Sequence, residues 1–146
     1  MNISEADLEA LTRDVWSTMI GMDLVDAVMA GTPGAGISSQ IEIQGDTDVA
    51  LRIDCSMELA RKVAARLFDM PEDEIETELV LDAMSEMANI IGGNLKGLWP
   101  GAIKLSLPVS WESAQSDPNE HFWNVARGFD SADGSMLVRV SGDGGN

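Results

Sequence analysis

The sequence predicts an α+β domain in which helices pack over a sheet that is rich in antiparallel strands. Three stretches have the apolar periodicity of amphipathic helices, and other runs alternate apolar with polar residues, as strands do. Two strand pairs are separated by short turns that contain glycine and aspartate, which is typical of hairpins. The segments do not follow the regular strand–helix–strand order of a parallel sheet, so the α+β class is favoured.

The first helix is predicted over residues 4–24. Ser4 and Asp7 have the spacing of a capping box, in which two side chains satisfy backbone amides of the first turn. The glycine-rich stretch 31–36 lacks the Gly-Lys-Ser/Thr ending of a phosphate-binding loop, so we expect an ordinary connection there. The inner face of the helix is expected to consist of Leu8, Leu11, Val15, Met19 and Met22.

A hairpin and a second helix follow. Residues 40–44 and 48–54 alternate between apolar and polar side chains, which predicts two strands. Gly45-Asp46-Thr47 lies between them and favours a hairpin turn. A second amphipathic helix is predicted over residues 56–69, with Ser56 as its N-cap. Its inner face is expected to consist of Leu59, Val63 and Leu67.

The longest helix is predicted from about Glu78 to Leu98, after Pro71 and an acidic turn. At about 100° per residue, its apolar residues form one stripe. That stripe consists of Val80, Met84, Met87, Ile91, Leu95 and Leu98. The opposite side of the helix consists of Asp82, Glu86, Asn89 and Gly93.

Glu86 and Asn89 are the strongest candidate site residues. Their three-residue offset places a carboxylate and a carboxamide on the same side of a helix. A solvated polar face is the usual explanation of such a side. Asparagine and the pair Gly92-Gly93 are poor helix residues, however, and the two glycines cost about 1–2 kcal/mol relative to alanine. A partner surface that approaches the helix closely explains these residues better than solvent does.

Three or four strands are predicted to complete the domain, over residues 102–107, 109–111, 121–129 and 135–140. Asp133-Gly134 between the last two is a hairpin signal. We expect a single domain over residues 1–141, followed by a flexible polar tail over residues 142–146.

A short internal echo suggests that the domain has two related halves. Residues 18–21 (Thr-Met-Ile-Gly) on the first helix align with residues 89–92 (Asn-Ile-Ile-Gly) on the third. In this alignment Val15 stands in the place of Glu86, and Thr18 stands in the place of the asparagine. The first half therefore lacks both polar groups of the candidate site.

Composition excludes several classes of function. Nine basic against twenty-five acidic residues give a net charge of −16, which argues against nucleic acid or an anionic membrane as the main partner. The acidic residues are spread along the chain and do not themselves locate a site. No apolar run approaches the ~18–20 residues of a membrane span, and the acidic start of the chain is unlike a secretory signal. The single Cys55 fits a reducing compartment, so we expect a cytoplasmic protein.

Other reactive or aromatic residues are weaker candidates. His121 has no serine, cysteine or carboxylate at a telling spacing. Cys55 is expected to be a small buried residue. The tryptophans are expected in the core, with Trp111 or Trp123 as alternatives for a dimer surface. The methionines expected between the two long helices are Met19, Met22, Met84 and Met87.

The run from Asp82 to Asn94, followed by Leu105-Ser106-Leu107-Pro108, resembles the CheX branch of the CheC/CheX/FliY phosphatases. Proteins of this family act on the phosphorylated receiver CheY in bacterial chemotaxis, and their order of elements is similar over nearly the whole chain. The resemblance implies two long antiparallel helices across a sheet built from two similar halves. CheC-like members keep the E-x-x-N pattern in both helices, whereas this chain keeps one, which is nearer to CheX.

The resemblance implies a phosphatase that hydrolyses the aspartyl phosphate of a CheY-like receiver in two-component signalling. A receiver carries a bound Mg²⁺ and a lysine beside this phosphoryl group, so no metal or cofactor belonging to this chain is expected. Asn89 would orient the attacking water, and Glu86 would pair with the receiver's lysine. Gly92 and Gly93 would let the partner approach the helix, and Asp82 would be a secondary contact.

Two other functions stay open. A non-catalytic module would dock on a receiver or a flagellar-switch component without hydrolysing anything. The presence of both Glu86 and Asn89 favours the enzyme, because an adaptor does not need that pair. A small-molecule hydrolase would use Asp82 and Glu86 as a carboxylate pair, but no enclosed pocket is signalled.

A homodimer is also expected. CheX-like proteins can pair through the edges of their sheets, where unpaired backbone groups are available. The strands Ile41–Gln44 and Ser135–Val140 are the predicted candidates for such an edge.

Overall fold

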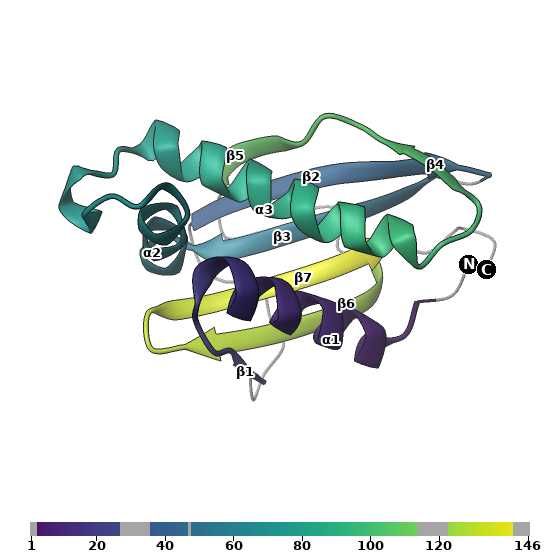
Figure 1. The fold of residues 1–146 in the computed structure, drawn as a ribbon, viewed down its shortest axis with the longest axis horizontal. Helices are drawn as coiled ribbons and strands as arrows, with labels where there is room; N and C mark the ends of the chain where they lie inside the picture. The colour runs from purple at the N-terminus through teal and green to yellow at the C-terminus, as the bar shows by residue number, and fades with distance from the viewer. Residues whose placement is uncertain (1–2, 27–35, 47, 114–122, 142–146) are drawn as a thin grey trace.

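In a computed structural model, helices cover one face of an antiparallel sheet (Figure 1). The structure describes residues 3–26, 36–46, 48–113 and 123–141. Most of the predicted glycine-rich loop, His121 and the predicted tail lie outside these residues. The α+β class with an antiparallel sheet is confirmed.

The strands form one sheet in the described part of the chain, in the order β1-β6-β7-β3-β2-β4, with β5 also paired to β2. They are β1 (Val25–Asp26), β2 (Gly36–Gly45), β3 (Val49–Ser56), β4 (Ala102–Leu105), β5 (Val109–Ser113), β6 (Trp123–Ser131) and β7 (Gly134–Ser141). The two long hairpins, β2–β3 and β6–β7, meet where β3 pairs with β7. Each half of the chain therefore contributes one hairpin to the centre of the sheet.

The helices are α1 (Glu5–Val15), α2 (Met57–Phe68) and α3 (Thr77–Gly97), with a π-helix over Trp16–Ile20 and a 3₁₀ turn over Glu72–Glu74. Helices α1 and α3 run antiparallel to each other (Figure 1). Helix α1 lies over the β6–β7 hairpin, and α3 lies over the β2–β3 hairpin. No helix in the described ranges is long and apolar enough to cross a membrane.

The capping box at the start of α1 is confirmed. The Asp7 amide donates to Ser4 Oγ at 3.0 Å, and the Ser4 amide donates to the Asp7 carboxylate at 3.3 Å. The predicted helix is shorter than expected, however, because Gly21 adopts the left-handed conformation with φ of 73° and ends it. Ser56 stands at the N-cap of α2 without capping it, since its hydroxyl accepts from the Ser135 amide of β7 instead.

Two predicted core positions are exposed. Met19 is 44% exposed, because it lies in the π-helix, whose i→i+5 bonding rotates the chain less per residue than an α-helix does. Leu98 is 54% exposed, because α3 ends at Gly97 before this residue can face the sheet. The other residues of the predicted α3 stripe are buried, as expected.

The two strands expected to offer a pairing edge are interior strands, so this prediction is wrong. The backbone of β2 pairs with β3 on one side and with β4 and β5 on the other. The backbone of β7 pairs with β6 and with β3. Their polar–apolar alternation reports which side chains face the helices, and it carries no information about neighbouring strands.

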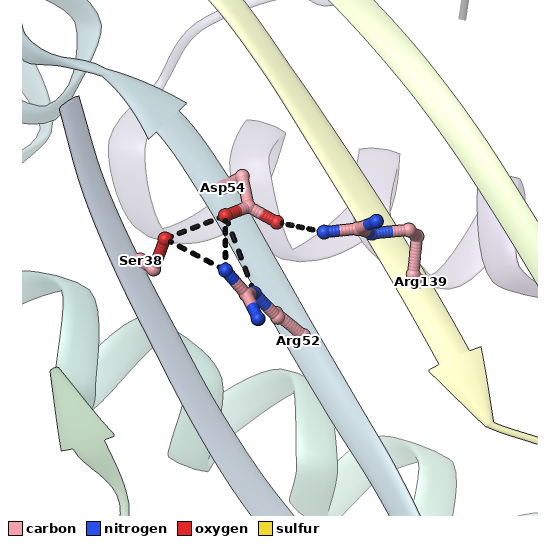
Figure 2. A network of polar contacts seen from close by, with 4 residues as sticks. All are labelled: Ser38, Arg52, Asp54 and Arg139. Atoms are coloured by element: carbon pink, nitrogen blue, oxygen red, sulfur yellow. Dashed lines mark hydrogen bonds and ion pairs between the residues drawn. The ribbon is translucent and has the colours of Figure 1, made fainter. Parts of the chain in front are cut away.

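The face of the sheet that the helices leave uncovered carries a buried polar network (Figure 2). Asp54 of β3 is 2% exposed, and its two carboxylate oxygens serve different partners. One accepts from Ser38 Oγ at 2.5 Å and from Arg52 Nη2 at 3.2 Å. The other accepts from Arg139 Nη2 of β7 at 2.6 Å. The carboxylate therefore ties the first hairpin to the second.

Two tryptophans stack on the arginines of this network. The guanidinium carbon of Arg52 lies 5.1 Å from the ring centroid of Trp111, and that of Arg139 lies 5.0 Å from the ring centroid of Trp123. Both distances fall within the range of cation–π contacts. These two tryptophans therefore pack on the charged centre of the sheet, and the structure does not test the dimer contact expected of one of them.

Replacing Asp54 with alanine is expected to lower the free energy of unfolding by about 3–5 kcal/mol, because two buried guanidinium groups lose their shared carboxylate. The exposed Asp48, just before β3, provides the matched control, and Asp48→Ala is expected to change stability by no more than about 0.5 kcal/mol. Urea denaturation followed by tryptophan fluorescence measures both. Equal stabilities of the two variants would show that the network does not hold the sheet together.

Candidate functional site

Glu86 and Asn89 lie on the outward side of α3, and the opposite side of this helix is buried. Met84, Met87, Ile91 and Leu95 are each 0% exposed and pack into the core between α3 and the sheet. On the opposite side Asp82, Glu86 and Gly93 are exposed, and Asn89 is half-buried. Because the back of the helix is close-packed, the helix has little freedom to rotate, and the direction of the outward side chains is fixed by the core.

The two glycines of the signature have different surroundings. A Cβ at Gly92 would lie 3.0 Å from Ile41 Cγ2 of β2, so this glycine is the point of close approach between α3 and the sheet. A Cβ at Gly93 would have only Leu105 Cδ1 near it, at 4.0 Å. Gly92 faces the sheet, and its expected role in partner approach is therefore corrected to helix–sheet packing. Gly93 is on the exposed side, where a partner can reach the backbone.

Asn89 lies on the flank of α3 that faces the β4–β5 edge. Ser85 Oγ lies 2.5 Å from Ser110 Oγ of β5, which ties this flank to the sheet one turn before Asn89. One turn after Asn89, the position of Gly93 borders Leu105 of β4. Residues spaced by four share one side of a helix, so Asn89 lies between these two contacts, alongside the segment that joins β4 to β5.

Neither side chain of the pair is engaged within the protein. Among the residues that the structure describes, Glu86 and Asn89 form no side-chain hydrogen bond or ion pair. Asn94 on another side of the same helix differs, because its side-chain amide donates to the Ile90 carbonyl at 3.0 Å. The carboxylate of Glu86 and the carboxamide of Asn89 are therefore both available to a molecule outside the chain.

The first helix carries no equivalent site. Val15, which replaces Glu86 in the internal echo, is 4% exposed and belongs to the core. Thr18 is exposed but lies in the π-helix, where the register differs from that of α3. The first helix therefore offers no outward carboxylate and carboxamide that match Glu86 and Asn89.

Other candidate residues have structural roles. Burial raises the pKa of the Cys55 thiol well above its usual value, and the neighbouring Asp54 carboxylate raises it further, so this cysteine is an inert core residue as expected. Trp16 and Trp99 are buried. Within the described residues, no three histidine, cysteine, aspartate or glutamate side chains are grouped as a metal site.

The comparisons with known proteins show that the fold is of the CheC/CheX type. The family model "Chemotaxis phosphatase CheX" matches residues 37–117, which is more than half of the chain. The chain therefore belongs to the CheX family of chemotaxis phosphatases. A search of curated proteins finds no match.

Solved structures support the same fold. CheX from Vibrio vulnificus has a TM-score of 0.76 at 18% identity, covering 96% of this chain and 99% of that one. The CheX–CheY–BeF₃–Mg²⁺ complex from Borrelia burgdorferi has a TM-score of 0.68 at 22% identity, covering 96% and 98%. FliY from Thermotoga maritima has a TM-score of 0.60 at 18% identity, covering 93% and 85%. Each of these likenesses covers more than nine tenths of this chain.

The two glycines are expected to respond in opposite ways to substitution. Gly92→Val places a branched side chain against Ile41, and overpacking of this kind lowers the free energy of unfolding by about 1–3 kcal/mol. Gly93→Ala adds a methyl group in open space and raises the free energy of unfolding by up to about 1 kcal/mol, because alanine is a better helix residue than glycine. Urea denaturation of the two variants makes the comparison. A more damaging effect of Gly93→Ala than of Gly92→Val would contradict this placement.

Proposed function

We propose that this chain hydrolyses the aspartyl phosphate of a CheY-like receiver domain, with Glu86 and Asn89 as its site residues. The observation that carries the proposal is the outward, unengaged pair on a helix whose back is fully buried. Such a pair is held in a fixed position, and it forms a complete site only when a partner supplies the other reacting groups. The family is one of chemotaxis phosphatases, and the receiver is the natural source of the phosphoryl group.

Asn89 is the proposed catalytic residue. An asparagine carboxamide offers one oxygen acceptor and two N–H donors, so it can accept a hydrogen bond from a water and donate to the phosphoryl oxygens at once. Phosphoryl transfer depends mainly on positioning and electrostatics, and one amide that holds water in line with phosphorus is a sufficient contribution. The half-buried position of Asn89 suits this role, because its side chain has little freedom before the receiver arrives.

Glu86 is proposed to dock the receiver. Its exposed carboxylate would form a charge-assisted pair with the lysine beside the receiver's phosphorylated aspartate. A pair of this kind fixes orientation and speeds association more than it changes the chemical step. Asp82, which is exposed one turn earlier, is a proposed secondary contact, and Gly93 is proposed to admit the partner's surface to the helix backbone.

The metal ion of the reaction is proposed to come from the receiver. The CheX–CheY complex from Borrelia burgdorferi contains BeF₃ and Mg²⁺. In the present chain the outward side of α3 offers one amide and separated carboxylates, which suits contact with a metal-loaded partner better than a metal centre. The water held by Asn89 would attack phosphorus as the P–O bond to the receiver's aspartate breaks, so that the aspartate leaves as a carboxylate and the water's proton goes to the released inorganic phosphate. The receiver's metal would balance the charge.

The second candidate function is a receiver-binding adaptor without hydrolysis, for which the exposed carboxylate of Glu86 would be enough. Turnover distinguishes the adaptor from the phosphatase. Phosphate release from a phosphorylated receiver, measured with and without this protein, is expected to be faster with it. Binding without any acceleration, for every receiver of the same organism, would support the adaptor and overturn the phosphatase.

Asn89→Ala is expected to lower the rate of receiver dephosphorylation by at least about 100-fold while largely sparing binding, because water positioning is lost and the docking surface is kept. Asn94→Ala is the matched control, since it removes the same side chain from a different side of α3. The measurement is loss of the phosphorylated receiver over time, with binding measured by calorimetry. Equal rates for the two variants would remove Asn89 from the mechanism.

Substitution of Glu86 is expected to weaken binding and turnover together. Glu86→Ala should raise the Kd by about tenfold, equivalent to about 1.4 kcal/mol. Glu86→Lys should raise it further, because a like charge then faces the receiver's lysine. Calorimetry at low and moderate salt measures both variants. A Glu86→Lys variant that binds as tightly as the native protein would exclude the proposed ion pair.

We also propose that the chain is cytoplasmic and forms a homodimer. The single cysteine, which fits a reducing compartment, supports the cytoplasmic location, and that is where a receiver would be met. Since β2 and β7 are interior, pairing would have to use other surfaces than the strands first considered. Sedimentation equilibrium is expected to give twice the chain mass, and a single-chain mass at all concentrations would contradict the dimer.

A further inference from the structure

Two serine hydroxyls meet where α3 packs on β5. Ser85 Oγ lies 2.5 Å from Ser110 Oγ, and both side chains are half-buried. Every buried residue of α3 is apolar or a glycine. Among the residues that the structure describes, the Ser85–Ser110 bond is the only hydrogen bond between side chains of α3 and the sheet. It is therefore the one directional side-chain contact in an otherwise apolar helix–sheet interface.

The strand pattern explains why Ser110 points to the helix. Trp111, the next residue, stacks on Arg52 on the face of the sheet without helices. Successive side chains of a strand point to opposite faces, so Ser110 points to α3. Its neighbour on β2 is Ser39, whose side chain is buried and has no hydrogen-bond partner within the described residues. Two serines therefore lie side by side on adjacent strands, and only Ser110 is bonded to the helix.

The serine contact is one turn away from the proposed catalytic residue. Ser85 and Asn89 are four residues apart on α3, so their Cβ atoms are about 5–6 Å apart on one side of the helix. A rotation of α3 that breaks the Ser85–Ser110 bond also moves the carboxamide of Asn89. The bond and the carboxamide are therefore mechanically linked through one turn of helix.

Apolar packing leaves the last few degrees of this rotation weakly determined. The sheet-facing residues on this part of α3 include Ala88 and Gly92, which have no side chain beyond Cβ to interlock with the strands. The hydrophobic effect has no preferred direction, so it holds the helix on the sheet without fixing its exact rotation. A hydrogen bond weakens steeply away from its preferred geometry, so the serine pair supplies the missing restraint.

A small rotation is enough to matter for the reaction. Side-chain atoms on the surface of a helix lie about 5–6 Å from its axis, so a rotation of about 10° moves them by about 1 Å. A misplacement of about 1 Å in a positioning group costs up to about 100-fold in rate. The longer and more flexible side chain of Glu86 compensates for such a shift, so docking is less sensitive than water positioning.

We infer that Ser85 and Ser110 are positioning residues, whose hydrogen bond sets the rotation of α3 and thereby the direction of the Asn89 carboxamide. This inference rests on the proposed function. The two serines act through Asn89 and have no chemical step of their own. Loss of the bond lowers kcat and leaves the affinity for the receiver nearly unchanged.

Ser110→Thr and Ser110→Val form the decisive pair, because the two side chains have the same shape and only threonine keeps a hydroxyl. Both are β-branched and suit a strand. Ser110→Val is expected to lower kcat about tenfold, and Ser110→Thr is expected to stay within about twofold of the native kcat. The kcat is measured as phosphate release from a phosphorylated CheY-type receiver of the same organism, at saturating receiver.

Binding is measured separately, by calorimetry with the same receiver activated with beryllofluoride and Mg²⁺. The Kd of both Ser110 variants is expected to stay within about twofold of the native value, because the docking carboxylate of Glu86 is kept. A fall in kcat without a rise in Kd is the signature of lost positioning. An unfolded or loosened protein would lose binding as well.

Two further serines provide matched controls. Ser141 Oγ accepts from the Ala50 amide at 2.8 Å, and Ser141 lies two residues after Arg139, on the face without helices. Ser110→Ala and Ser141→Ala each remove one hydroxyl bond from the sheet, so thermal unfolding is expected to show similar losses of stability. Only Ser110→Ala is expected to lower kcat. Ser39→Ala, which removes the adjacent unbonded hydroxyl, is expected to keep kcat within about twofold of the native value.

A double variant tests whether the two hydroxyls act through one bond. Ser85→Ala alone is expected to lower kcat by about as much as Ser110→Ala does. The variant that carries both substitutions is expected to lose no more than either single variant, because the same bond is removed in each case. Effects that multiply in the double variant would contradict a shared bond.

The outcomes separate this inference from the proposed function. Equal kcat values for Ser110→Thr and Ser110→Val overturn the positioning role, while loss of turnover in Asn89→Ala would still support the phosphatase. An equal fall in kcat for Ser141→Ala and Ser110→Ala also overturns it, because the effect would then follow stability. A native protein that accelerates the dephosphorylation of no receiver overturns both.

Discussion

The sheet depends on one shared carboxylate. Asp54 accepts from Ser38 and Arg52 within the first hairpin and from Arg139 in the second, and all four side chains lie on the face without helices (Figure 2). A charge buried in this way is costly unless every partner is in place, so it enforces one pairing of β3 with β7. That pairing sets where α1 and α3 lie, because each helix packs on one hairpin.

The candidate site depends on how α3 packs on the sheet. Gly92 lets the helix approach Ile41 closely, and the Ser85–Ser110 contact ties its flank to β5. The outward side chains are consequently presented by a rigid element, and within the described residues neither Glu86 nor Asn89 forms a side-chain hydrogen bond or ion pair. A site of this form offers polar groups in a fixed orientation. It is suited to a substrate that brings its own pocket, as a folded receiver with a phosphorylated aspartate does.

Charge does not by itself locate the site. The protein is strongly acidic, and its net charge of −16 argues against polyanionic partners. On α1, Glu5 and Glu9 already pair with Arg127 of β6, and Glu9 also pairs with Arg13. Helix α2, which also packs against α3, carries Arg61, Lys62 and Arg66. The helices beside α3 therefore carry both signs of charge, and the candidate site is defined by the placement of Glu86 and Asn89 on α3.

Local patterns in the sequence determined the α+β class, the capping box at Ser4 and Asp7, the hairpins and the outward side of α3, because each depends on residues within a few positions of one another. Only the tertiary structure decided that Gly92 packs on the sheet whereas Gly93 is open, and that β2 and β7 are interior. It also decided that Arg52 and Asp54, polar positions of an ordinary alternating strand, are buried. These features depend on contacts between distant segments, and strand alternation states which face a side chain takes without stating what covers that face.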